Sequence, residues 1–125
     1  MKVAAIVMSR VLAFVDTADL SPTAGVNAPD FVREITKQFY FQKYPQKLEE
    51  FDATKGIEFL TGRFGKRAIP KFALWPNLLT IETRSNTTEA QALLGEMLTW
   101  AKDKFGLTYS AEMITHYAYI SDLSF

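Results

Sequence analysis

The chain of 125 residues contains no cysteine and only one histidine. The absence of cysteine excludes disulfides, thiolate metal sites and cysteine nucleophiles. Because His116 stands alone, one chain cannot build a metal site or a proton relay from two histidines. The common nucleotide-binding loops are absent as well, since neither GxxxxGK followed by Ser or Thr nor GxGxxG occurs. We therefore expect no metal and no cofactor, and the sequence leaves open whether the protein is an enzyme.

The sequence also lacks a net charge, because 14 basic residues balance 14 acidic ones. A general attraction to nucleic acid or to a membrane surface thus has no global driving force, and we expect neither partner. The charge is unevenly spread, however. Residues 31–71 contain nine Lys and Arg against five Asp and Glu, whereas residues 72–125 contain three against six. An anionic partner would therefore bind the middle third of the chain.

The N-terminus resembles a signal peptide at first sight, because Lys2 precedes an apolar run. Arg10 interrupts that run, and no small-residue cleavage pattern follows it. At about 13 residues the run is also too short to span a bilayer. We interpret the segment as part of the fold and expect a cytoplasmic protein, which agrees with the lack of cysteine.

Composition and length predict one globular domain over residues 1–125, with 48% hydrophobic and 22% charged residues. Apolar periodicity and the Pro, Gly and Asn positions then divide the chain. A strand over 6–15, expected to be buried on both faces, is followed by a helix from Pro29 to about residue 38. A second helix is capped by Asn86 and closed by Gly106, with Glu89 placed to complete a capping box. The further strands are predicted over 56–64, 72–75, 78–84 and 113–121.

This order of elements predicts the α+β class. The expected architecture is an antiparallel sheet of four to five strands with two helices packed on one face. It approximates the split βαβ, ferredoxin-like arrangement with an added strand.

Residues 39–51 carry five aromatic rings interleaved with lysine and glutamine, which could indicate a base-stacking surface or simply core. Phe39 continues the apolar side of the first helix, and the acidic pair before Phe51 is a poor neighbour for phosphates. We therefore interpret most of these rings as core. Tyr40 and Tyr44 are the exceptions, because a phenol can lie half-buried with its hydroxyl in water.

The segment GRFGKR over 62–67 is the sharpest charge feature of the chain. Its glycines could free backbone amides, and its cations could hold a phosphate or nucleotide. The alternative is a solvated turn that keeps one end of the sheet soluble. A small enzyme or anionic-ligand binder built on this turn would use Arg63, Lys66, Arg67 and Lys71, together with Arg84, His116 and the carboxylates Glu58 and Glu82.

A non-enzymatic binding or assembly protein that forms a homo-oligomer is the function favoured by the sequence. The chain has 17 aromatic residues, and Tyr117, Tyr119 and Phe125 could contribute to an interface. Residues 113–125 contain no Lys, Arg or Pro, which are the residues that usually guard an edge strand. The alternative is that this last strand inserts centrally and is covered on both sides by its own chain.

Overall fold

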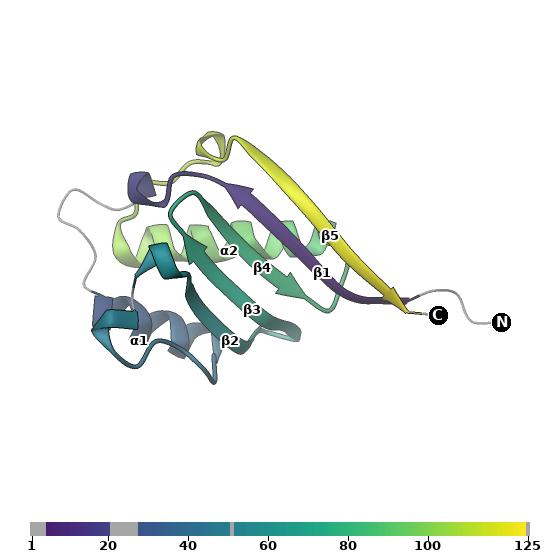
Figure 1. Ribbon diagram of the computed structural model, residues 1–125, viewed down its shortest axis with the longest axis horizontal. Coiled ribbons are helices and arrows are strands. Elements are labelled where there is room, and N and C mark those ends of the chain that lie inside the picture. Colours follow the sequence, from purple (N-terminus) through teal and green to yellow (C-terminus); the bar gives the residue numbers. More distant parts are fainter. Residues whose placement is uncertain (1–4, 21–27, 51, 125) are drawn as a thin grey trace.

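A computed structural model describes residues 5–20, 28–50 and 52–124 and confirms the α+β class (Figure 1). The sheet has five antiparallel strands in the order β2-β3-β4-β1-β5. The elements along the chain are β1 (Ala5–Phe14), α1 (Ala28–Phe39), β2 (Ile57–Phe64), β3 (Arg67–Trp75), β4 (Leu78–Thr83), α2 (Thr87–Phe105) and β5 (His116–Ser124).

Both helices cover the same face of the sheet, as predicted (Figure 1). α2 packs along β1 and β4, and α1 packs on β2. The helices also contact each other, since the rings of Phe39 and Trp100 lie 5.1 Å apart between centroids. Near the middle of α1, Glu34 Oε2 lies 3.4 Å from Lys104 Nζ of α2. The sheet and these two helices therefore enclose a core. On the opposite sheet face, which we call the open face, no helix lies among the residues that the structure describes.

The strand order does not confirm the ferredoxin-like arrangement. β4, α2 and β5 form a split βαβ unit, because β4 and β5 run parallel to each other with β1 between them. The first crossover differs, since β1 and β2 run in opposite directions with two strands between them. The helix α1 thus joins two antiparallel strands.

The helix α2 forms where its caps predict. The Asn86 side chain accepts a hydrogen bond from the Glu89 amide at 2.8 Å, which satisfies one of the free N–H groups at the helix start. Gly106 ends the helix with φ of 69°, a left-handed conformation that glycine adopts without strain. Between the caps, helical spacing predicts an apolar stripe of Ala90, Leu93, Leu94, Met97, Ala101 and Phe105; all of these are buried except Phe105, which is partly buried, and Leu98 is buried beside them.

The prediction that β1 is buried on both faces is wrong. Val11 and Ala13 are fully buried beneath the helices, whereas Leu12 and Phe14 are only partly buried on the open face. The reason is that both helices pack on one face, so alternate β1 side chains lack a cover. Arg10 also points to the open face, where its guanidinium pairs with the Glu82 carboxylate on β4.

Most rings of residues 39–51 belong to the core, as predicted. Phe39 and Phe41 are buried and Tyr44 packs against the core, whereas Phe51 lies outside the described residues. Tyr40 is the exception: it has φ of 56° and is 60% exposed. Its ring stacks beneath the Arg63 guanidinium, 4.8 Å from the ring centroid.

The side-chain alternation of β2 shifts by one residue at Thr61, whose φ is 58°. Before it, Ile57 and Phe59 are buried in the core, and after it Phe64 packs on Phe39. The shift brings the Gly62 backbone against the Phe41 ring. An added Cβ at Gly62 would lie 2.5 Å from Phe41 Cδ1 and 2.6 Å from the Phe39 carbonyl oxygen.

Gly62→Ala is expected to lower the free energy of unfolding by about 1–3 kcal/mol, because the new methyl group overpacks a site bounded by backbone. Gly95→Ala is the matched control, since nothing lies within 4 Å of its Cβ position on α2. That variant should gain about 0.5–1 kcal/mol from helix propensity. Urea denaturation measures the free energy of unfolding of both variants, and equal effects of the two substitutions would contradict the close packing around Gly62.

Candidate functional site

The cations of the predicted basic turn lie at one end of the β2–β3 hairpin, but each has a different environment. Arg67 Nη1 donates to Glu96 Oε2 on α2 at 2.6 Å, and Arg63 stacks on Tyr40. Lys66 lies exposed in the two-residue turn between the strands. Two of these three cations are thus engaged within the chain, and anion binding by them stays a prediction.

The other predicted ligand residues are dispersed over the molecule. Lys71 Nζ pairs with Glu58 Oε2 at 2.6 Å on the open face. Arg84 is exposed just beyond the end of β4. His116 is exposed on β5, where its ring stacks on Phe14 with 4.1 Å between centroids. None of the concave sites described below is lined by Arg84 or His116.

A shallow hollow of ≈290 Å³ on the open face is lined by two cations, Arg10 and Lys71. Trp75 and Leu78 form its apolar side. Arg10 pairs with Glu82 and Lys71 pairs with Glu58, so neighbouring carboxylates already balance both charges. Glu58 and Glu82, the carboxylates that the sequence analysis grouped with the basic residues, are therefore partners in ion pairs.

The strand β5 lies at one edge of the sheet, so the alternative that it inserts centrally is wrong. Among the described strands it pairs with β1 only. Two adjacent side chains on it, Tyr119 and Ile120, are 52% and 43% exposed. Tyr117 is partly buried and stacks on Tyr119 at 6.2 Å, and Tyr119 Oη donates to Gln91 Oε1 on α2 at 2.6 Å. Phe125 lies outside the described residues.

The opposite edge of the sheet, β2, is protected by the chain itself. Lys43 forms an isolated bridge with Leu60, in which the Leu60 amide donates to the Lys43 carbonyl at 2.8 Å. The Gln42 amide also donates to the Leu60 carbonyl at 3.1 Å. The irregularity at Thr61 then interrupts the edge, which is a common way to prevent pairing with another chain.

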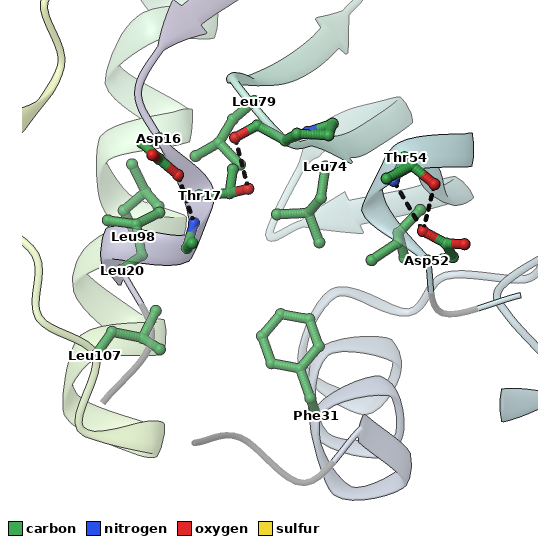
Figure 2. Close-up of a pocket in the computed structure, with 13 residues that line it drawn as sticks. Asp16, Thr17, Leu20, Phe31, Asp52, Thr54, Leu74, Leu79, Leu98 and Leu107 are labelled. Carbon is green, nitrogen blue, oxygen red and sulfur yellow. Dashed lines mark hydrogen bonds between the residues drawn. The ribbon is translucent and has the colours of Figure 1, made fainter. Parts of the chain in front are cut away.

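An apolar pocket of ≈410 Å³ opens at the end of the two-layer structure where β1 finishes (Figure 2). Strands, helices and turns all contribute to its wall, and its volume lies in the range of about 300–1,000 Å³ typical of small-molecule sites. Its main apolar side chains are Leu20, Phe31, Ile57, Leu74, Leu79, Leu98 and Leu107.

Hydrogen bonds between distant segments hold the rim of this pocket. Thr17 lies in the short turn η1 (Thr17–Leu20), and its hydroxyl donates to the Trp75 carbonyl at 2.9 Å. The Thr17 amide also donates to the Pro76 carbonyl at 3.0 Å. On the other side, the Thr108 amide donates to the Leu20 carbonyl at 2.9 Å, which ties the segment after α2 to η1. These hydrogen bonds join η1 to the turn between β3 and β4 and to the segment after α2.

Two carboxylates, Asp16 and Asp52, lie on opposite sides of the pocket (Figure 2). Asp16 Oδ1 accepts from the Ala18 amide at 3.0 Å. Asp52 Oδ1 accepts from the Thr54 hydroxyl at 2.6 Å and from the Thr54 amide at 3.0 Å. The Thr54 hydroxyl, its amide and the nearby charge of Lys55 lower the pKa of Asp52 below its ordinary value. Within the described residues, no hydrogen bond uses the second oxygen of either carboxylate.

Comparison with family models, with curated proteins and with solved structures finds no match for this chain. No helix among the described residues is long and apolar enough to cross a membrane. In the same part of the chain, no group of three or more His, Asp or Glu side chains is placed to hold a metal ion.

The pocket could not be predicted from the sequence, which gives no reason to bring Asp16 and Asp52 together. Asp52 received no role at all. A local signal did exist in the stretches Asp16-Thr17-Ala18 and Asp52-Ala53-Thr54, because an aspartate often accepts from the amide two residues later and starts a turn. That signal predicts the two turns but not their meeting at one cavity.

Burial raises the pKa of Tyr117 above its ordinary value of 10.0, with smaller contributions from Tyr109 and Tyr119. Burial also raises the pKa of Tyr109. The fold thus favours the neutral phenols. Their contribution to the free energy of unfolding is complete below about pH 10 and is lost as the pH rises through the folded-state pKa.

Tyr117→Phe should make the unfolding free energy fall less steeply above about pH 10. Denaturation at several alkaline pH values measures this, and an unchanged slope would show that Tyr117 is not shifted.

Proposed function

We propose that the protein is a non-enzymatic assembly protein, which self-associates by pairing β5 with β5 of a second copy. The observation that carries this proposal is that β5 is a nine-residue edge strand bearing two of the large exposed apolar side chains, Tyr119 and Ile120. The strand contains no Lys, Arg or Pro. An edge of this kind is a template for pairing with another chain.

The geometry of such pairing limits the assembly to two chains. Antiparallel pairing of a strand with its own copy is isologous, because the same surface is used by both partners. The two-fold operation closes once two copies have joined, and the five-stranded sheets become one continuous sheet. No further β5 edge then remains for a third chain.

The side chains of β5 add apolar contacts to the backbone pairing. Successive strand residues point to opposite faces, so Tyr119 lies on the helix face and Ile120 on the open face. Both are near the middle of β5 and would therefore lie near the two-fold axis in a centred pairing. On each face of the joined sheet, one exposed apolar side chain from each copy would become buried. Tyrosine is also enriched at protein interfaces.

The contrast between the two sheet edges supports β5 as the interface rather than β2. The β2 edge is bridged by Lys43 and interrupted at Thr61, and the strand itself contains Arg63. None of these devices occurs on β5 from His116 to Ile120. The chain thus protects one edge and leaves the other available.

Sedimentation velocity at tens of micromolar protein is expected to show a dimer. Tyr119→Lys and Ile120→Lys should each weaken dimerisation about tenfold or more, since each places two like charges near the two-fold axis. Tyr40→Lys is the control, because Tyr40 is 60% exposed but lies far from β5 along the sheet. It should leave the dimer intact. A wild-type monomer, or a dimer that both β5 variants preserve, would contradict the proposal.

A further inference from the structure

We infer that the apolar pocket beside Asp16 and Asp52 is a binding site for a small apolar molecule that carries a positively charged amine. This inference is independent of self-association, because the pocket lies at the end of β1 and not along β5. It starts from the chemistry of the pocket wall, which offers leucine, isoleucine and phenylalanine side chains to an apolar ligand (Figure 2).

The size and construction of the pocket suit a small ligand rather than a protein segment. A volume of ≈410 Å³ is within the range of small-molecule sites. The Phe31 ring lines the pocket and belongs to the core, where its centroid lies 5.0 Å from that of the Phe105 ring. The hydrogen bonds of Thr17 and Thr108 fix the rim, and a ligand would not have to order these segments when it binds.

The charge of the pocket selects among apolar ligands. Asp16 and Asp52 are the ionisable side chains that line it, and both are acidic. One oxygen of each carboxylate is used in its own turn, which fixes the side chain and leaves the other oxygen available as an acceptor. An ammonium group at the mouth would gain from both carboxylates, whereas a fatty acid would be repelled.

Three probes with the same tail test the inference: n-octylamine, n-octanol and n-octanoate, each kept below its micelle concentration. Isothermal titration of the intact wild-type chain should show the order amine, alcohol, carboxylate in decreasing affinity. The amine should bind roughly three- to tenfold more tightly than the alcohol, as two exposed ion pairs would give. This preference should shrink as salt is added.

Two variants separate the apolar and the charged contributions. Asp16→Asn with Asp52→Asn keeps both turn-forming acceptors, so it should leave alcohol binding unchanged and reduce amine binding to the same level. Ala18→Trp places a large ring at the exposed rim and should abolish binding of amine and alcohol. Ala111→Trp is the matched control in another short turn and should bind as wild type does.

Three results would overturn the inference. Absence of binding by both amine and alcohol would show that the pocket takes no apolar ligand of this size. Octanoate binding as tightly as octylamine would remove the charge selection. An amine preference that survives in the double Asn variant would place the cation elsewhere.

Discussion

The position of β1 between β4 and β5 is the constraint on which the rest of the structure depends. Its partners come from much later in the chain: the Thr115 amide donates to the Phe14 carbonyl across 101 positions, and Arg10 pairs with Glu82 across 72. With β1 occupied on both sides, β5 lies at the sheet edge. Because both helices cover one face, β1 also divides its side chains between a buried and an open side.

The parts of the fold that could be predicted from the sequence are those that local chemistry decides. The helix α2 is an example, because Asn86 and Gly106 satisfy its ends and its apolar stripe has helical spacing. The burial of β1 was predicted wrongly, since a continuous apolar run does not show that one face lacks a helix. The position of β5 in the sheet could not be predicted either. A central strand has a second neighbouring strand that an edge strand lacks, and the local sequence does not show which strands are neighbours.

The candidate sites show the same limit. The basic residues near the β2–β3 turn are close in sequence, yet Arg67 reaches α2 and Arg63 reaches Tyr40. The apolar pocket instead brings together residues that are far apart in the sequence, such as Asp16 and Leu107. Its carboxylates form ordinary turns locally, and they line one cavity only because the end of β1 lies near the turn before β2. A pocket of this kind becomes visible only when the topology is known.

Hydrogen exchange at several protein concentrations tests the central claim, that β5 is the free edge at which two copies join. Amides of β5 that face away from β1 should become more protected as the concentration rises, because pairing with a second copy gives them acceptors. The amide of Leu60 on the β2 edge is the internal reference, since it already donates to Lys43 and should exchange at the same rate throughout. Exchange of the β5 amides that does not change with concentration would contradict the account.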